Sequence, residues 1–233
     1  MSIVAVVLAG GRGERMGRGE NKVFVPLRGI PAIVRAIAPF STLCSHLVVV
    51  ARQEELAAME QLLKRYGMSH LVHKVVPGGS NRQASVLAGL MALPPDADVV
   101  LVHDGARALV TEAVIQRVIN SAMEHGSGIA SVPVTDTIKR AGGDGRVRET
   151  LPREELFAMQ TPQGFRVELL RQAHNHALET GYLGTDDAAL VEHMGLPVYL
   201  CRGDHENIKL TTPLDVALAE RILETRAMGG ADA

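Results

Sequence analysis

The chain of 233 residues has no tryptophan, and aromatic residues make up only 3% of it. A hydrophobic core must therefore be built from aliphatic side chains and methionine, in a sequence that is 46% apolar. Its two cysteines, Cys44 and Cys201, lie far apart and match no metal-binding spacing. We expect two buried free thiols, as is usual in a reducing compartment, rather than a disulfide framework or a zinc site.

The sequence also lacks a strong excess of charge and a long apolar run. Lysine and arginine number 24 and aspartate and glutamate 26, which leaves a formal net charge of −2 and argues against a nucleic-acid-binding protein. No apolar stretch approaches the roughly 18 residues that cross a bilayer. The first residues carry neither the basic region nor the cleavage site of a secretory signal. We therefore expect a cytoplasmic protein that binds neither membranes nor nucleic acid.

Short apolar runs rich in β-branched residues alternate with helical patterns. Such runs are typical of strands buried on both faces of a parallel sheet. The alternation predicts an α/β fold in a single domain over residues 1–233, with a doubly wound, mostly parallel sheet. The expected strands are Ile3–Ala9, Leu47–Ala51, Leu71–Val76, Val99–His103 and Gly128–Val132. The expected helices between them are Pro31–Pro39, Gln53–Tyr66, Asn81–Leu93 and Thr111–His125.

The alternation stops after Val132. Two short polar–apolar segments, Thr135–Arg140 and Arg146–Leu151, flank a Gly-Gly-Asp-Gly sequence and predict a β-hairpin. Because its arginines leave the hairpin little apolar surface, we expect a projecting β-arm over about residues 135–155 that reaches a second subunit. The expected later elements are helices at Val167–Thr180, Thr185–His193 and Pro213–Arg226, and strands at Val198–Cys201 and Asn207–Leu210.

A glycine-rich, basic sequence directly follows the first expected strand. It runs from Gly10 to Gly17 as GGRGERMG, and Lys22 comes soon after it. Glycines let backbone N–H groups face an anion, and the basic side chains supply counter-charge, so we expect a phosphate-binding loop. Met16 replaces the third glycine of the dinucleotide fingerprint, and no P-loop sequence occurs. What remains resembles the signature of sugar nucleotidyltransferases, in which a phosphate attacks a nucleoside triphosphate and pyrophosphate leaves.

Two further candidate sites follow other expected strands. Asp104 lies beyond the carboxyl end of Val99–His103, at the edge where open α/β sheets bind ligands. One carboxylate beside a triphosphate suits Mg²⁺, which keeps several waters and needs few protein ligands. The segment Gly78–Ser85 predicts either a helix capped by Ser80 or a nucleobase pocket formed by backbone groups and Ser85.

Six segments in order resemble the 2-C-methyl-D-erythritol 4-phosphate cytidylyltransferases. They are Leu8–Lys22, Gly78–Val86, Val102–Arg107, Val134–Lys139, Leu151–Gln163 and Glu206–Thr211, and they are distributed over nearly the whole chain. The resemblance implies a Rossmann-like nucleotidyltransferase fold. It also implies that CTP, with Mg²⁺ or another divalent cation, donates a cytidylyl group to 2-C-methyl-D-erythritol 4-phosphate.

The resemblance implies a role for individual residues as well. The catalytic cations would be Arg15, Lys22 and Lys209. The residues expected to bind CTP are Leu8, Ala9, Gly10, Gly11, Gly13, Gly79, Arg82, Ser85, Asp104 and Gly105. Asp104 would also hold the metal, and the second substrate would be bound by Asp104, Arg107, Thr137, Arg153 and Thr161. The family is typically a homodimer, which implies that Thr137 and Arg153 act in the neighbouring site.

Three alternatives remain open. A ribitol- or glycerol-phosphate cytidylyltransferase would share the fold and the nucleotide site, but Asp136–Lys139 and Pro152–Gln163 favour the methylerythritol enzymes. A non-catalytic nucleotide-binding regulator could lose the charged residues Lys22, Asp104 and Lys209, which are all present. A glycosyltransferase would carry an Asp-x-Asp motif at the carboxyl edge of the sheet, where this chain has none.

The sequence departs from the family pattern at Asn21, where a proline usually precedes the lysine. This substitution predicts a less stiff loop around Lys22. Outside the six segments, Thr185–Asp187 is expected to cap a helix. His174 fits no metal-ligand spacing and is expected at a surface position or a helix end.

Overall fold

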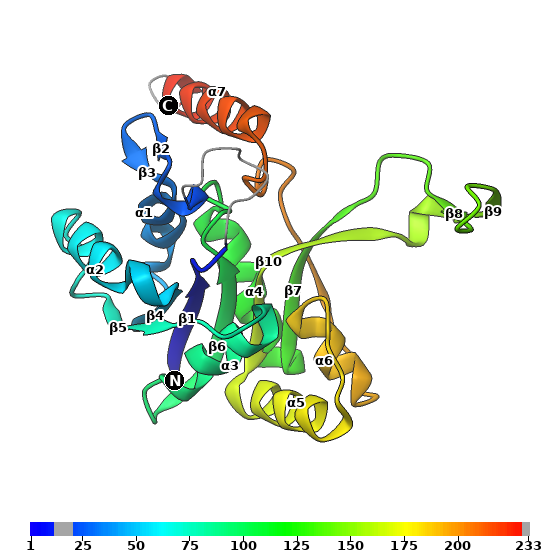
Figure 1. The fold of residues 1–233 in the computed structure, drawn as a ribbon, viewed down its shortest axis with the longest axis horizontal. Helices are drawn as coiled ribbons and strands as arrows, with labels where there is room; N and C mark the ends of the chain where they lie inside the picture. The colour runs from blue at the N-terminus through cyan, green and yellow to red at the C-terminus, as the bar shows by residue number, and fades with distance from the viewer. Residues whose placement is uncertain (12–20, 230–233) are drawn as a thin grey trace.

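The computed structural model describes residues 1–11 and 21–229. Within them, seven strands form a central sheet in the order β11-β7-β10-β6-β1-β4-β5 (Figure 1). The strands are β1 (Ser2–Leu8), β4 (His46–Ala51), β5 (Val72–Pro77), β6 (Ala97–Asp104), β7 (Ser127–Pro133), β10 (Phe157–Arg166) and β11 (Leu200–Arg202). Among these strands, β10 runs antiparallel to β6 and β7, and the other neighbouring pairs are parallel. The expected α/β fold with a mostly parallel sheet is confirmed.

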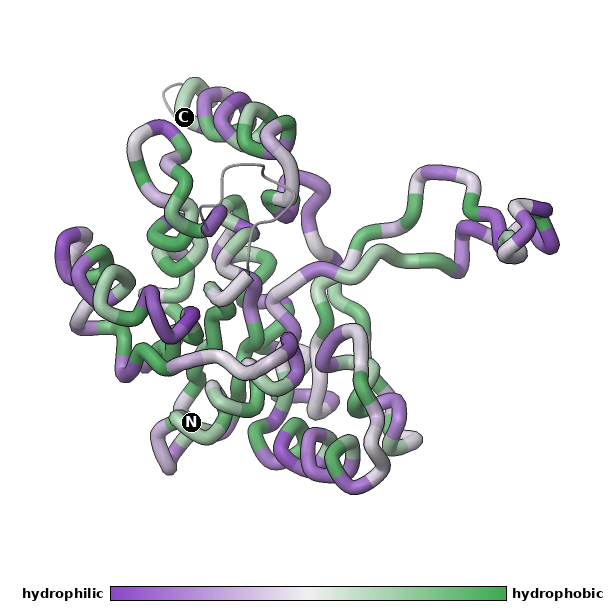
Figure 2. The backbone as a smooth tube through the Cα atoms, viewed as in Figure 1, coloured by the Kyte–Doolittle hydropathy of each residue, from purple (hydrophilic) through white to green (hydrophobic). Residues whose placement is uncertain are grey.

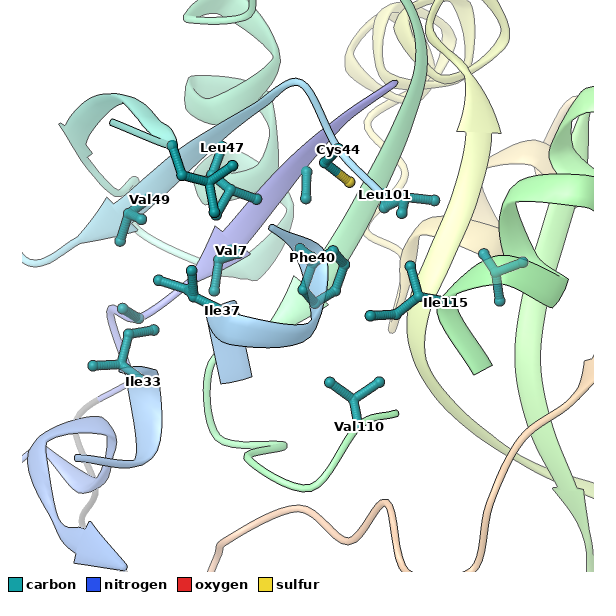
Figure 3. Close-up of a cluster of buried hydrophobic side chains, with 14 of the residues drawn as sticks. Val7, Ile33, Ile37, Phe40, Cys44, Leu47, Val49, Leu101, Val110 and Ile115 are labelled. Atoms are coloured by element: carbon teal, nitrogen blue, oxygen red, sulfur yellow. The ribbon is translucent and has the colours of Figure 1, made fainter. Parts of the chain in front are cut away.

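Helices cover both faces of the sheet. One face carries α1 (Ala32–Ile37), α2 (Leu56–Arg65) and α4 (Glu112–His125), and the other carries α3 (Arg82–Met91), α5 (Val167–Thr180) and α6 (Asp187–His193). Successive side chains of β1 point to opposite faces, so that Val4 and Val6 pack with the second set of helices. Val7 packs with the first set, where Figure 3 shows it near Ile37. The sheet is therefore doubly wound.

Strand β10 lies in a region where the sequence pattern predicts no strand. Pro162 stands inside it, and the pairing of β10 with β7 is interrupted between Met159 and Gln163. A proline has no N–H group to donate to a ladder, so a central strand is unexpected at such a sequence. The strand carries Thr161, an expected site residue, to the end of β6, where its hydroxyl accepts from the N–H of Asp104.

The two expected strands after the hairpin also differ in the structure. The strand expected at Val198–Cys201 is β11, shifted to Leu200–Arg202. The segment Asn207–Leu210 is not a strand, although the N–H of Leu210 donates to the carbonyl of Ala106 at 2.9 Å. After it, α7 (Pro213–Gly229) packs through Ala219 in a third cluster of buried residues.

The predicted hairpin is present as β8 (Lys139–Ala141) and β9 (Val147–Thr150), which pair antiparallel. Figure 1 shows it at the end of two long connections, away from the central sheet. Each residue of the two strands is exposed, including Val147 at 60%. Figure 2 shows that hydrophilic residues make up much of the hairpin and its surroundings. The hairpin therefore has no hydrophobic core of its own.

Both cysteines are buried and free, as expected. Burial raises the pKa of the Cys44 thiol to about 12. In the described part of the chain, no helix has the length and apolar character needed to cross a membrane.

Candidate active site

A cavity of about 620 Å³ lies beyond the carboxyl ends of β1, β4, β5 and β6. This is the edge at which ligands bind in open α/β sheets. Nine residues expected at the site line it, namely Leu8, Gly10, Gly11, Lys22, Gly79, Arg82, Ser85, Asp104 and Lys209. The structure thus brings nine of the expected site residues together around one cavity. The expected site residues Arg15 and Gly13 lie outside the described residues.

Asp104 is the charged centre of the cavity. Its Oδ2 lies 2.6 Å from Nζ of Lys209, and its Oδ1 lies 3.8 Å from Nε of Arg82. Burial raises the pKa of this carboxyl, but the two cations outweigh burial and bring the pKa to about 2. The carboxylate is therefore ionised across the physiological pH range and faces the cavity as a fixed negative charge.

The glycine-rich turn before α3 forms one wall of the cavity. Ser85 donates from its hydroxyl to the carbonyl of Asn81 at 2.8 Å and accepts from the N–H of Gly79 at 3.1 Å. A Cβ atom on Gly79 would lie 2.4 Å from Cβ of Ala84, so only glycine fits this approach to the helix. The cap of α3 is Asn81, whose side chain accepts from Ala84, and not Ser80 as expected. Asn81 has the extended backbone of an N-cap residue, and its Oδ1 accepts from the N–H of Ala84 at 2.8 Å.

Lys22 begins the short 3-10 helix η2 (Lys22–Phe24). A Cβ atom placed on Gly11 would lie 3.9 Å from Cε of Lys22, so the lysine stem runs beside the glycine sequence that follows β1. Lys22 and Lys209 thus reach the same cavity from segments far apart in the chain.

Asn21 fixes the position from which Lys22 starts. Its Nδ2 donates to the carbonyl of Ala9 at 2.6 Å and to Oε2 of Glu55 at 2.8 Å, and its Oδ1 accepts from the N–H of Val23. The side chain is 2% exposed, and both of its amide hydrogens are used. The expected loss of stiffness without a proline is therefore offset by three hydrogen bonds at this residue.

Ala9 and Gly105 do not line the cavity but support it. Ala9 is buried and donates its N–H to the carbonyl of Val50 at 2.7 Å. Gly105 donates its N–H to the carbonyl of Leu8 at 2.9 Å, which joins the segment that follows β6 to the end of β1. A Cβ atom on Gly105 would lie 3.0 Å from that same carbonyl oxygen.

Thr161 and Arg107 lie close to Asp104 and are engaged with the protein itself. The hydroxyl of Thr161 accepts from the N–H of Asp104 at 3.0 Å and lies 3.1 Å from Nδ1 of His103. Burial lowers the pKa of His103 to about 4, so its neutral ring accepts the Thr161 hydrogen and offers Nε2–H to the carbonyl of Arg107. Arg107 donates from Nη1 to the carbonyl of Asn207 at 2.6 Å.

Thr137 and Arg153 are the expected site residues that the chain does not bring to its own cavity. Both are exposed and lie near the base of the hairpin, and neither lines the cavity. Arg153, in the 3-10 helix η5 (Arg153–Glu155), donates to the carbonyl of Thr135 at 3.0 Å. Within a single chain, the described residues expected to bind the nucleotide therefore lie around the cavity, whereas Thr137 and Arg153 lie outside it.

A buried polar group behind the cavity was not expected. Asp186 caps α6, as predicted, but the next residue, Asp187, is fully buried and lies 2.7 Å from Nη2 of Arg82. His174 is also fully buried, which makes the expectation of a surface position wrong. A signal for Asp187 does exist in the sequence. The apolar Leu190 and Val191 follow it by three and four residues, so helical periodicity puts Asp187 on their buried face.

A cavity that presents lysines and open backbone beside one ionised carboxylate suits a nucleoside triphosphate. On a doubly wound sheet, this arrangement places the chain among the α/β nucleotidyltransferases. The sequence profile of the 2-C-methyl-D-erythritol 4-phosphate cytidylyltransferases matches residues 3–225. The chain belongs to this family.

Individual relatives agree with this assignment. The chain is 46% identical to the 2-C-methyl-D-erythritol 4-phosphate cytidylyltransferase of Geobacillus kaustophilus over 228 residues, which cover 97% of this chain and 99% of the relative. The crystal structure of the Thermus thermophilus protein of that name is 32% identical, with a TM-score of 0.77 over 95% of this chain and 98% of that one. The 4-diphosphocytidyl-2C-methyl-D-erythritol synthase of Anaerococcus prevotii has a TM-score of 0.85 at 25% identity, covering 96% and 98%.

Proposed function

We propose that the chain transfers the cytidylyl group of CTP to 2-C-methyl-D-erythritol 4-phosphate. The products are 4-diphosphocytidyl-2-C-methyl-D-erythritol and pyrophosphate. The observation that carries this proposal is the convergence of Lys22, Asp104 and Lys209 on one cavity in a chain of this family. A non-catalytic nucleotide-binding regulator could lose one or more of these charges, and all three are present.

The reaction needs two anions to approach within bonding distance, because a phosphate oxygen of the acceptor attacks the α-phosphorus of CTP. Lys22 and Lys209 reduce the repulsion, and their charges stabilise the pentavalent transition state more than the separate substrates. The pyrophosphate leaves as the new P–O bond forms, so no covalent enzyme intermediate is required. Arg15 is the third cation that we propose for this task, on the family resemblance.

The residues around Asp104 fit a magnesium ion held mainly by the nucleotide. Among the described residues, no group of three or more His, Cys, Asp or Glu side chains could hold a metal ion. Mg²⁺ typically takes one or two protein carboxylates, with phosphate oxygens and water for the rest. Such an ion would neutralise triphosphate charge. We propose that Asp104 supplies one oxygen to it, while Lys209 passes from Asp104 to a phosphate group.

We propose that the second substrate lies on the side of Asp104 where Arg107 and Thr161 are found. Thr137 and Arg153 would complete this subsite from the arm of a partner in a homodimer. The support is that both residues are exposed and neither lines the cavity of its own chain.

The free cysteines further suit an enzyme of the cytoplasm.

A pyrophosphate-release assay tests the proposed function. CTP is offered with 2-C-methyl-D-erythritol 4-phosphate, ribitol phosphate or glycerol phosphate, and UTP, ATP and GTP replace CTP as controls. We expect the highest kcat/KM with CTP and the methylerythritol phosphate. A higher kcat/KM with ribitol or glycerol phosphate would reassign the acceptor, and no release with any pair would refute catalysis.

A further inference from the structure

Arg82 lines the nucleotide cavity, yet its closest ionic partner lies behind the cavity wall. We propose that Asp187 is a positioning residue that holds Arg82 away from Asp104 and so keeps the Asp104 carboxylate available to the nucleotide. This inference rests on the proposed function and assigns a role to a helix, α6, that does not line the cavity.

The distances show how the guanidinium of Arg82 is shared. Its Nη2 lies 2.7 Å from Oδ2 of Asp187, whereas its Nε lies 3.8 Å from Oδ1 of Asp104. The Asp187 side chain is 1% exposed and the Arg82 side chain 29%. Arg82 therefore makes its close contact with the buried carboxylate and only a longer contact with the one that faces the cavity.

The backbone of Asp187 is fastened to the central sheet by Gln163 of β10. Oε1 of Gln163 accepts from the N–H groups of Asp187 at 3.1 Å and Ala188 at 3.3 Å. Its Nε2 donates to Oδ2 of Asp186 at 2.8 Å, so the whole start of α6 is held. The Asp187 carboxylate thus occupies a fixed position from which it can orient Arg82.

The local charges keep this arrangement ionised. Burial raises the pKa of Asp187, but the charge of Arg82 and the nearby His174 outweigh it and leave the pKa below its usual value. His174 contributes from α5, with its Nε2 3.8 Å from Oδ1 of Asp187. A buried carboxylate without a cation is costly, so Asp187 holds Arg82 firmly.

Asp104 is the alternative carboxylate partner of Arg82. If Asp187 lost its charge, Asp104 would remain as a carboxylate within reach of the guanidinium. Arg82 would then close the 3.8 Å gap and occupy an oxygen that faces the cavity. Because Lys209 already contacts the other oxygen, Asp104 would present less free charge to the nucleotide and its metal.

A double-mutant cycle tests whether Asp187 acts through Arg82. We expect Asp187→Asn to lower kcat/KM for CTP at least about fivefold, which is within the range of coupling between contacting residues. In an Arg82→Ala background, the same substitution should change kcat/KM by less than about twofold, because the arginine it would release is gone. A merely structural role predicts the same fold loss in both backgrounds, and that result would overturn the inference.

Glu192→Gln is the matched control, since it removes an exposed carboxylate of the same helix and glutamine is a good helix former. It should leave kcat/KM near the wild-type value. Asp187→Ser is a second variant without the charge, and thermal melts identify any variant that fails to fold.

Calorimetric CTP binding to the same four proteins of the cycle gives a readout without turnover. A wild type that binds CTP but releases no pyrophosphate would refute the proposed function while the binding cycle still decides the role of Asp187.

Discussion

Lys22 is the residue whose charge the proposed reaction needs most directly among those described. We expect Lys22→Ala to lower kcat by about 10²–10³-fold, because one lost transition-state donor costs roughly 2.7–4 kcal/mol. Steady-state pyrophosphate release at saturating CTP measures this change. Lys64→Ala, which removes an exposed lysine of α2, is the control and should leave turnover unchanged. Near-wild-type turnover in Lys22→Ala would remove Lys22 from the catalytic group.

Cys44 gives the stability of the fold a dependence on alkaline pH. The pKa of its thiol rises from 9.0 to about 12 on burial, so the unfolded chain ionises this group first as the pH increases. The free energy of unfolding should therefore fall by about 1.4 kcal/mol between pH 8 and pH 10 on account of this residue. Below pH 8 the contribution should be constant.

Denaturant unfolding under reducing conditions, with wild type and Cys44→Ala side by side, measures this contribution. All other titrating groups are shared, so the difference between the two pH slopes isolates Cys44. Parallel slopes would show that the thiol ionises as easily in the folded protein as in the unfolded chain.

Single residues also show the limits of prediction from sequence. Asp104 and Lys209 could be predicted because each belongs to a segment that carries the family resemblance. Asp187 could not be assigned its contact, because the pairing with Arg82 joins residues about a hundred positions apart. His174 looked like a surface residue since a histidine alone carries no signal of burial.

At the scale of elements, the turn between β5 and α3 shapes the nucleotide cavity. A Cβ atom on Gly79 would lie 2.4 Å from Cβ of Ala84, well inside contact distance. Gly79→Ala should push the turn off the first turn of α3 and raise KM for CTP by about tenfold or more, a cost of about 1–3 kcal/mol for overpacking. Initial rates over a range of CTP concentrations measure it.

The chain offers a matched test of that explanation. Ala84→Gly removes the atom that the new methyl group would strike, so the double variant Gly79→Ala/Ala84→Gly should recover part of the affinity for CTP. An unchanged KM in Gly79→Ala would mean that the turn is not held against α3 as the structure shows.

The elements themselves were predictable where local signals are strong. Apolar runs predicted the parallel strands, and turn residues predicted the hairpin. Strand β10 escaped prediction because Pro162 breaks its pattern, and only the tertiary pairing with β6 and β7 defines it. The segment with Asn207 and Lys209 was expected to be a strand, but it runs beside the cavity as irregular chain.

At the scale of the whole molecule, the chain separates two sets of expected site residues. The body gathers the nucleotide residues on one edge of the sheet, whereas Thr137 and Arg153 belong to an arm whose strands are exposed along their whole length. A projecting, mostly polar hairpin gains little by folding on its own. Contact with a second copy would stabilise the hairpin, and the homodimer that we propose supplies that contact.

Subunit mixing tests this arrangement. Lys22→Ala inactivates the nucleotide site of its own chain, and Arg153→Ala removes the contribution of its arm to the site of its partner. If the arms act across the dimer, a mixed dimer contains one site with a wild-type Lys22 and a wild-type Arg153, so mixing two nearly inactive homodimers should restore activity. At full exchange, half of the dimers are mixed and each has one working site, so about a quarter of wild-type activity is expected.

Native mass spectrometry of differently tagged chains verifies that the subunits exchange. The matched control mixes Lys22→Ala with Lys209→Ala, two residues that line the same cavity of one chain. This control should gain no activity on mixing, because each chain of the mixed dimer lacks one of the two lysines and neither cavity is complete. Recovery confined to the Arg153→Ala mixture supports a site shared between two chains. Verified exchange without recovery would place Arg153 in the site of its own chain, which would require the arm to fold back toward the body.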